Sequence, residues 1–236
     1  MDRIFLFDLG NVLAKSLDDY YLYNKLNCKI SYDEFLQYWW NDDLVLKAHM
    51  GLVTDEEHID KLLRLCKSDL SINQFYEIYN SLDTSLYDET IEIINELKNK
   101  GYKVGLLSNL RLMDYKRYEQ QIGKINFDYI FLSYKMKCIK PSSDIYLQVI
   151  NTLKCDPDNI IFFDDNEKNV NIAKQHGINA YQVTGENIKE DDLEAIQKGC
   201  LNYVPIHFMP SLKYQENCED YYFQGLESQI IQRIQL

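Results

Sequence analysis

The feature that most constrains the fold is a series of short, apolar segments separated by longer amphipathic ones. The apolar segments lie at residues 2–8, 102–108, 127–133, 159–165 and, more weakly, 179–184. Such runs are typical of strands buried on both faces of a sheet. Helical spacing predicts helices at 88–100, 112–122, 142–154 and 167–176, three of which precede a glycine (Gly101, Gly123 and Gly177) that is expected to end them. This alternation predicts the α/β class, with a parallel sheet covered by helices on both faces.

Two regions depart from this alternation. The region from about Lys15 to Leu82 contains no strand-like run, and it has three helix starts of the capping-box type, at Ser31/Glu34, Thr54/Glu57 and Ser71/Gln74. The tail from Leu201 mixes aromatic residues with a final amphipathic stretch. We therefore expect a discontinuous α/β core (residues 1–14 and 83–200), an all-helical insertion (15–82) and a C-terminal extension (201–236).

Composition excludes several classes of partner. The 236 residues are 46% hydrophobic and carry a formal net charge of −12. We therefore expect no nucleic acid and no membrane as partner. The C-terminal tail could be a dimerisation element or a strap across the core, so we expect a monomer or homodimer. No apolar run is long enough to cross a bilayer, so we expect a cytoplasmic protein. The six cysteines are scattered without metal-binding spacing, which favours reduced thiols.

Polar side chains stand where the predicted strands end. In an open parallel sheet, ligands bind outside the carboxyl ends of the strands. Four clusters lie there in this chain: Asp8, the pair Ser108-Asn109, Lys140 just before Pro141, and the pair Asp164-Asp165. The sequence therefore predicts one site at this edge of the sheet.

Phosphoryl transfer through a covalent aspartate requires these residue types together. The Asp8 carboxylate can attack phosphorus and form an aspartyl-phosphate that water later hydrolyses. A phosphate dianion is repelled by carboxylates unless cations intervene, and Mg²⁺, which prefers oxygen ligands, meets that need. Lys140 adds a fixed positive charge, and the Ser108 hydroxyl can donate to a phosphoryl oxygen.

The segments "FDLGNV", "LLSN", "KP" and "FFDDN", in this order around a helical insertion, resemble the four motifs of the haloacid dehalogenase (HAD) superfamily. The resemblance covers roughly residues 1–190 and implies a Rossmann-like core. The helical insertion resembles the C1-type cap of that superfamily. The first and last segments are most similar to its sugar-phosphate phosphatase branch, which includes α-D-glucose-1-phosphate phosphatase. The resemblance thus implies a Mg²⁺-dependent phosphatase whose partner is a small-molecule phosphate ester.

The resemblance also implies a metal site. Asp8 would be both the nucleophile and a metal ligand, and Asp165 would be the second metal carboxylate. Gly10 would offer only its backbone carbonyl. Asp164 and Asn169, the latter one helical turn after Asp165, would complete the metal site from behind the direct ligands.

The remaining matched residues would contact the substrate. Ser108 and Asn109 would bind the phosphate, and Lys140 would be the lysine of the third motif. Lys15, soon after the first motif, and Arg111, soon after the second, are further candidates for contacting the phosphate.

Gly10 departs from the usual pattern of the superfamily, because most of its phosphatases carry a second aspartate there. That aspartate protonates the leaving oxygen and then deprotonates the attacking water. Loss of a positioned acid/base typically costs about 10²–10⁴-fold in rate. We therefore hypothesise a substrate with an acidic leaving hydroxyl, such as the anomeric hydroxyl of a sugar 1-phosphate.

Two other functions compete with this one. A metal-independent 2-haloacid dehalogenase also lacks the second aspartate, but it carries small polar residues where this chain has Asp164-Asp165. A catalytically impaired HAD-fold binding protein would fit Gly10, but Asp8, Lys140 and Asp165 are all kept.

Aromatic and basic residues of the insertion are further candidates for substrate contact. Trp39 and Trp40 cannot share one helix face, so at least one is predicted to pack in a core. Lys47 and His49 are predicted to belong mainly to the insertion's own core or its solvated face.

Overall fold

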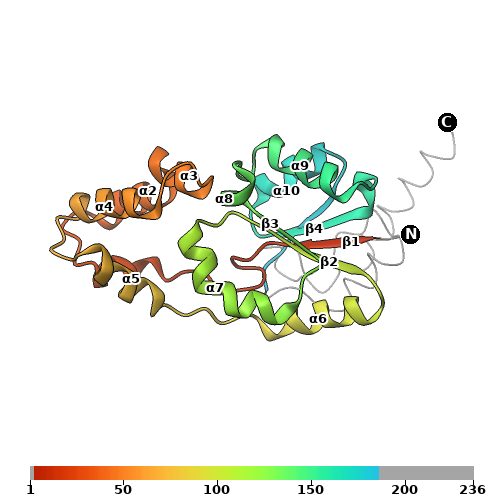
Figure 1. Cartoon of the computed structure of the whole chain (residues 1–236), viewed down its shortest axis with the longest axis horizontal. Helices are drawn as coiled ribbons and strands as arrows, with labels where there is room; N and C mark the ends of the chain where they lie inside the picture. The colour runs from red at the N-terminus through yellow and green to blue at the C-terminus, as the bar shows by residue number, and fades with distance from the viewer. Residues whose placement is uncertain (1–2, 186–236) are drawn as a thin grey trace, which may run out of the picture.

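A parallel five-stranded sheet forms the centre of the protein in the computed structural model, which describes residues 3–185 (Figure 1). The strands are β1 (Ile4–Phe7), β2 (Lys103–Ser108), β3 (Tyr129–Leu132), β4 (Ile160–Asp164) and β5 (Asn179–Gln182). They lie in the order β3-β2-β1-β4-β5, and every neighbouring pair is parallel. The predicted α/β class and all five strands are confirmed. The predicted extension at 201–236 lies outside the described residues.

Helices cover both faces of the sheet, as Figure 1 shows. They are α6 (Asp88–Asn99), α7 (Leu112–Ile125), α9 (Ser143–Leu153) and α10 (Glu167–Gln175), with the short α8 (Ser133–Met136) and a 3₁₀ turn at Pro157–Asn159 between them. Phe5 and Phe7 of β1 belong to the core under α6 and α7, whereas Ile4 and Leu6 belong to the core under α9 and α10. This alternation explains why β1 is apolar at every position, since both of its faces are buried.

Helix α7 shows one wrong prediction. The helix does not end at Gly123; it continues to Ile125 and is closed by Asn126 in the left-handed conformation. A glycine inside a helix costs only about 1 kcal/mol relative to alanine. Ile122 and Ile125, on either side of Gly123, are buried against the sheet, and their packing outweighs that cost. Gly101 and Gly177, in contrast, follow their helices with positive φ, as expected.

Residues 15–82, between β1 and α6, contain helices but no strand, and they project from one end of the sheet (Figure 1). We call this region the helical insertion. It contains α1 (Asp19–Lys25), α2 (Tyr32–Asn41), α3 (Asp43–His49), α4 (Asp55–Leu65) and α5 (Ile72–Asn80). All three predicted capping boxes are formed, at the starts of α2, α4 and α5. Buried aromatic residues such as Phe35, Trp39 and Phe75 give the insertion a hydrophobic core of its own.

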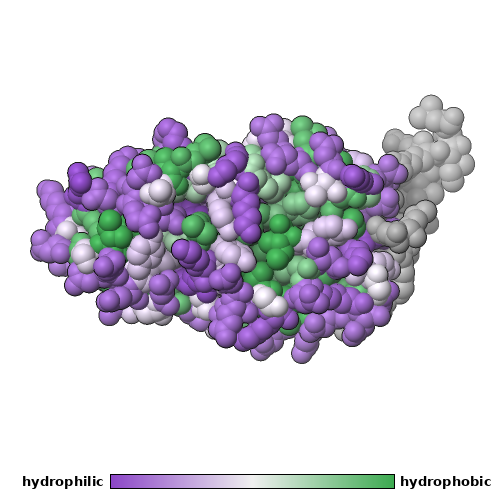
Figure 2. Space-filling model, viewed as in Figure 1, coloured by the Kyte–Doolittle hydropathy of each residue, from purple (hydrophilic) through white to green (hydrophobic). Residues whose placement is uncertain are grey.

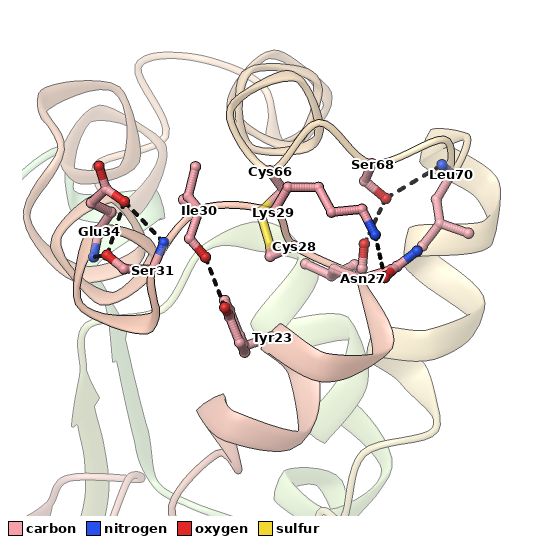
Figure 3. Close-up of a disulfide and its surroundings, with 11 residues drawn as sticks. Tyr23, Asn27, Cys28, Lys29, Ile30, Ser31, Glu34, Cys66, Ser68 and Leu70 are labelled. Atoms are coloured by element: carbon pink, nitrogen blue, oxygen red, sulfur yellow. Dashed lines mark hydrogen bonds between the residues drawn. A yellow bond between two sulfur atoms is a disulfide. The ribbon is translucent and has the colours of Figure 1, made fainter.

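A disulfide joins Cys28 to Cys66 inside the helical insertion (Figure 3). It connects the segment between α1 and α2 to the end of α4, across 38 positions of sequence. The prediction of reduced thiols is therefore wrong for this pair, while Cys138 and Cys155 are free. Sequence spacing could not show the pair, because the helices that bring it together are placed by packing. A cross-link of this kind stabilises a fold mainly by restricting the unfolded chain.

The surface seen in Figure 2 is mostly hydrophilic, with apolar surface over the region of the edge strand β3. Ile130, in the middle of that strand, is 42% exposed. Among the described helices, none combines the length and apolar character that crossing a bilayer requires.

Two glycines, the buried Gly105 and the exposed Gly123, should respond in opposite ways to replacement by alanine. A Cβ on Gly105, in β2, would lie 2.8 Å from Leu6 Cδ2 and 2.9 Å from the Tyr129 carbonyl oxygen. We expect Gly105→Ala to lower the free energy of unfolding by about 1–3 kcal/mol. Among the described residues, no atom lies within 4 Å of a Cβ on Gly123. We expect Gly123→Ala to raise the free energy of unfolding by about 0.5–1 kcal/mol.

Urea unfolding of the two variants and the wild type, followed by circular dichroism, measures both changes. Stabilisation by both substitutions would contradict the packing of β2 described above.

Candidate active site

The carboxyl ends of β1, β2 and β4 open into a pocket of about 560 Å³ that the helical insertion covers. Of the predicted site residues, all but Asp164 line it: Asp8, Gly10, Lys15, Ser108, Asn109, Arg111, Lys140, Asp165 and Asn169. Asp164 ends β4 and is fully buried behind the pocket. The expectation that these residues lie at one edge of the sheet thus agrees with the structure.

The Lys140 ammonium group lies between two of the carboxylates. Nζ is 2.9 Å from Asp8 Oδ1 and 2.6 Å from Asp164 Oδ2, and it donates to the Leu107 carbonyl oxygen at 2.9 Å. The contacts with Asp164 and Leu107 are hydrogen bonds, and the contact with Asp8 is an ion pair. Because Lys140 is only 3% exposed, its charge is stabilised by these partners rather than by water.

Asn109 holds the backbone of Lys140. Its Oδ1 accepts from the Lys140 N–H at 2.8 Å, and its Nδ2 donates to the Lys140 carbonyl oxygen at 2.8 Å. The peptide bond between Lys140 and Pro141 is cis. The side-chain amide of Asn109 therefore positions Lys140, which sequence reasoning did not foresee. A phosphate-binding role for Asn109, which remains a prediction, would fall to its backbone.

Both carboxylate oxygens of Asp164 accept hydrogen bonds from other residues of the protein. Oδ1 accepts from the Asn166 N–H and from Asn169 Nδ2, and Oδ2 accepts from Lys140 and Asn169. This carboxylate therefore fixes Lys140 and the start of α10, which begins with Asn166 as its N-cap. The sequence placed Asp164 and Asn169 outside the direct metal ligands. The hydrogen bonds between these two side chains are compatible with that prediction, which remains a prediction.

Of the three clustered carboxylates at the strand ends, Asp8 and Asp165 line the pocket. Burial raises the pKa of Asp8 to about 6, although Lys140 and a hydrogen bond from Ser108 oppose that shift. Asp165 Oδ2 accepts from Asn11 Nδ2 at 2.7 Å. The left-handed conformation of Asn11, with φ of 57°, turns the chain immediately after Gly10. Asn11 is a site residue that sequence reasoning missed.

The residues present fit a divalent cation that prefers oxygen. One carboxylate oxygen from each of Asp8, Asp164 and Asp165 lies within 4.8 Å of the other two. Mg²⁺ is usually held by one or two carboxylates and retains several waters. Asp8 and Asp165 meet this requirement, since both line the pocket.

Gly10 leaves open space beside Asp8. Among the described residues, no atom lies within 4 Å of a Cβ built on Gly10. Gly10 therefore leaves room for a side chain at the position where most phosphatases of the superfamily carry the second aspartate.

Arg111 lies in the wall of the pocket and forms a buried ion pair with Asp114. Nε and Nη2 of Arg111 donate to the two carboxylate oxygens at 2.9 and 3.0 Å. The guanidinium also stacks on the Trp39 ring of the insertion, 4.3 Å from its centroid. Burial alone would raise the pKa of Asp114, but Arg111 outweighs it and holds that pKa well below its usual range. Asp114, three residues after Arg111, was also missed by sequence reasoning.

The insertion contributes seven residues to the pocket: Lys15, Leu17, Trp40, Asn41, Leu46, His49 and Tyr79. Trp39 is fully buried and Trp40 is 45% exposed, which confirms that the two rings do not share one environment. Burial and the neighbouring Arg111 lower the pKa of His49 to about 4, so its ring is neutral near pH 7. Lys47 is paired with Asp43 and does not line the pocket.

Comparison with known proteins assigns the chain to a family. The model of the family described as "Haloacid dehalogenase-like hydrolase" matches residues 5–183. The chain belongs to this family. It is therefore a HAD-like hydrolase and an enzyme, as the four motifs predicted.

Solved structures support the assignment. The HAD family enzyme bt-2542 from Bacteroides thetaiotaomicron is 26% identical to this HAD-like hydrolase, with a TM-score of 0.71 over 82% of this chain and 98% of that one. A structure of the same enzyme in complex with magnesium and inorganic phosphate has a TM-score of 0.69 at 26% identity, over 81% of this chain and 98% of that one. A structure described as a dehalogenase, 20% identical with a TM-score of 0.56 over 77% of this chain and 84% of that one, shares the fold.

Among curated proteins, acyl-CoA dehydrogenase family member 10 from Mus musculus is 22% identical over 151 residues. These residues are 62% of this chain but only 14% of that protein. The chain thus matches a small part of that relative.

A further buried carboxylate, that of Asp55, joins the insertion to the core. Asp55 begins α4, and its Oδ2 accepts from the Met113 N–H in α7 at 2.8 Å. Burial and the nearby Asp114 raise the pKa of Asp55 to about 6. His58 lies 3.8 Å away, but burial lowers its pKa to about 2, so it stays neutral and forms no ion pair.

The raised pKa of Asp55 predicts a pH-dependent effect on stability. The ordinary aspartate pKa is about 3.9. The folded state therefore binds this proton more tightly than the unfolded state does, and the contribution of Asp55 to stability falls as pH rises from about 4 to about 6. Asparagine keeps the acceptor for Met113 without the charge. We expect Asp55→Asn to raise the melting temperature relative to the wild type at pH 7.5, with a smaller gain at pH 4.5.

Thermal unfolding at both pH values measures this effect. Asp33→Asn is the matched control, because Asp33 is also in the first turn of a helix of the insertion but is exposed. An equal gain at the two pH values would contradict the assignment to Asp55.

Proposed function

We propose that this HAD-like hydrolase is a Mg²⁺-dependent phosphatase that hydrolyses a small phosphorylated metabolite, such as a sugar phosphate. The single observation that carries the proposal is the Lys140 ammonium shared between Asp8 and Asp164, beside Asp165. A carboxylate nucleophile, a buried cation and a further acidic ligand are the groups that phosphoryl transfer through aspartate requires. The 26%-identical bt-2542, solved with magnesium and inorganic phosphate, supports this choice.

Asp8 would act as the nucleophile. One carboxylate oxygen attacks phosphorus, the bond from phosphorus to the substrate oxygen breaks, and the substrate oxygen leaves as an anion that takes a proton from solvent. Water then attacks phosphorus of the aspartyl-phosphate, which releases inorganic phosphate and regenerates Asp8. Lys140 keeps Asp8 ionised and in place, and the Ser108 hydroxyl donates to a phosphoryl oxygen.

Asp8, Asp165 and the Gly10 carbonyl would hold Mg²⁺, with Asp164 and Asn169 behind them. When bound, the ion neutralises the charge of the phosphate and of the carboxylates around it. This acidic set favours a phosphatase over a metal-independent dehalogenase, since a halogenated acid brings no phosphate charge to offset.

The helical insertion would act as a C1-type cap. Under this proposal the chain divides into a core (1–14 and 83–200), a cap (15–82) and an extension (201–236). Lys15, at the start of the cap, lines the pocket and would contact the phosphate. A cap that closes over the substrate excludes bulk water from the reacting groups.

Gly10 would restrict the substrates to those with good leaving groups. No carboxyl group at that position can protonate the leaving oxygen, so the leaving hydroxyl must be acidic in itself. The anomeric hydroxyl of a sugar 1-phosphate meets this requirement better than an ordinary alcohol does.

Hydrolysis of p-nitrophenyl phosphate tests the proposed function. We expect Mg²⁺-dependent turnover by the wild type and loss of activity by about 10³-fold or more in Asp8→Asn, which removes the nucleophile with little change in shape. Asp158→Asn, in the 3₁₀ turn outside the pocket, is the control and should retain activity. Activity that survives both chelation and Asp8→Asn would refute the proposal, and halide release from 2-haloacids without metal would favour the dehalogenase.

Restoring the missing carboxyl tests the explanation for Gly10. The open space beside Gly10 accommodates a side chain. We expect Gly10→Asp to accelerate hydrolysis of simple alkyl phosphates by about 10²-fold or more, because a positioned acid/base contributes that much. Hydrolysis of p-nitrophenyl phosphate should change little, since its leaving group needs no proton.

Gly10→Asn is the matched control, because it fills the same space without an acid. Equal rates on alkyl phosphates in the wild type and Gly10→Asp would show that the missing carboxylate does not limit this enzyme.

A further inference from the structure

The pocket has a second, basic region made by helix α7. Arg111, Asp114, Arg117 and Tyr118 line it on the core side, and Tyr79 lines it on the side of the insertion. The proposed mechanism uses none of the last four residues. Two guanidinium groups in one substrate pocket are unusual in a protein of net charge −12 and require an explanation.

Arg111 presents one unpaired edge. Its Nε and Nη2 are occupied by Asp114, whereas Nη1 is buried and has no hydrogen-bond partner among the described residues. The residue as a whole is only 2% exposed. Asp114 balances the charge of Arg111, but it leaves this N–H group unsatisfied.

Arg117 has more guanidinium nitrogens without a hydrogen-bond partner than Arg111 has. Its Nη2 donates to the Tyr118 hydroxyl at 3.0 Å, while Nε and Nη1 are buried without a hydrogen-bond partner in the described part of the chain. The guanidinium stacks on the rings of Tyr79 and Tyr118, with distances of 4.6 and 4.8 Å to their centroids. Within residues 3–185, no carboxylate oxygen lies within ion-pairing distance of Arg117.

Three guanidinium nitrogens at one end of the pocket thus lack partners. A buried donor left unpaired typically costs about 1–3 kcal/mol, and more when it is charged. Rings that hold a guanidinium in a fixed position lower the entropy lost when it binds an anion. In the part of the chain that the structure describes, the wall of the pocket therefore carries a guanidinium group, that of Arg117, without a carboxylate partner.

We propose that Arg117, with the free Nη1 edge of Arg111, forms a second anion subsite. The substrate would then carry a second anionic group, a carboxylate or a further phosphate, at the end remote from the phosphoryl group that Asp8 attacks. This inference rests on the proposed phosphatase function and narrows its substrate class to phosphate esters with two anionic ends.

The position of Tyr79 links this subsite to the insertion. Tyr79 belongs to α5 and covers the guanidinium of Arg117, which belongs to α7 of the core. Movement of the insertion away from the core would uncover Arg117 for an incoming anion. On its return, the Tyr79 ring would again stack on the guanidinium.

Binding of non-hydrolysable phosphonates tests the subsite without requiring turnover. The probes are ω-phosphonoalkanoates of graded chain length, each compared with its terminal amide, and α,ω-bisphosphonates of the same lengths. Isothermal titration calorimetry with Mg²⁺ and the full chain measures the affinities. At the length that spans the pocket, we expect a terminal anion to bind the wild type about tenfold or more tightly than the amide.

Arg117→Gln should reduce this anion-to-amide ratio to near one. Arg64→Gln is the matched control, because Arg64 is an exposed arginine of α4 outside the pocket, and it should leave the ratio unchanged. Preference for the carboxylate or for the second phosphonate identifies the anion, and either preference supports the subsite. A ratio near one at every length in the wild type, or an unchanged ratio in Arg117→Gln, overturns it. If Arg117→Gln does not fold, the wild-type ratio decides.

Parallel assays with p-nitrophenyl phosphate separate the two proposals. Turnover of that ester with no preference for a terminal anion refutes the subsite and leaves the phosphatase function intact. Absence of both turnover and phosphonate binding refutes the phosphatase function, and the subsite with it.

Discussion

The contact on which the rest of the site depends is the Lys140 ammonium between Asp8 and Asp164. Three chain segments meet there, since Asp8 follows β1, Asp164 ends β4, and Lys140 is held by Asn109 at the end of β2. A buried ammonium without such partners would be very costly. The order of the strands, with β1 between β2 and β4, is what allows one cation to reach both carboxylates.

The pocket has two unlike ends. At one end, Asp8, Asp164 and Asp165 outnumber Lys140, and this excess of negative charge suits a divalent cation. At the other end, Asp114 balances Arg111, whereas no carboxylate of residues 3–185 forms an ion pair with Arg117. A substrate that bridges the two ends meets a metal-assisted phosphate site and a guanidinium site in one cavity. Gly10 lies at the acidic end, where most phosphatases of the superfamily would carry one more carboxylate.

Much of this arrangement could be read from the sequence, because it depends on local rules. Buried parallel strands are apolar at every position, and side chains at their ends gather at one edge, so Asp8, Ser108 and Asp165 could be placed together. The capping boxes, such as that of Ser31, depend on residues only three apart.

The rest depends on contacts between distant segments, which spacing does not encode. The disulfide of Cys28 and the continuation of α7 past Gly123 are decided by tertiary packing. The hydrogen bonds between the Asn109 amide and the Lys140 backbone join residues 31 positions apart, and neither segment alone predicts them. Arg111 was expected to contact phosphate; its pairing with Asp114, which caps the same helix, could have been suspected from their separation of three.

The loop that follows β2 couples the insertion to the catalytic groups. Asn109 holds Lys140, and the next residue, Leu110, donates its N–H to Ser133 Oγ, which itself donates to the His49 carbonyl oxygen of the insertion. A few residues later, the Met113 N–H donates to Asp55 of α4. The same short segment thus contacts the buried lysine and α4 of the insertion directly, and α3 of the insertion through Ser133. A displacement of the insertion must therefore strain or break contacts made by the segment that positions Lys140. The position of the insertion over the pocket and the position of the Lys140 side chain thus depend on each other.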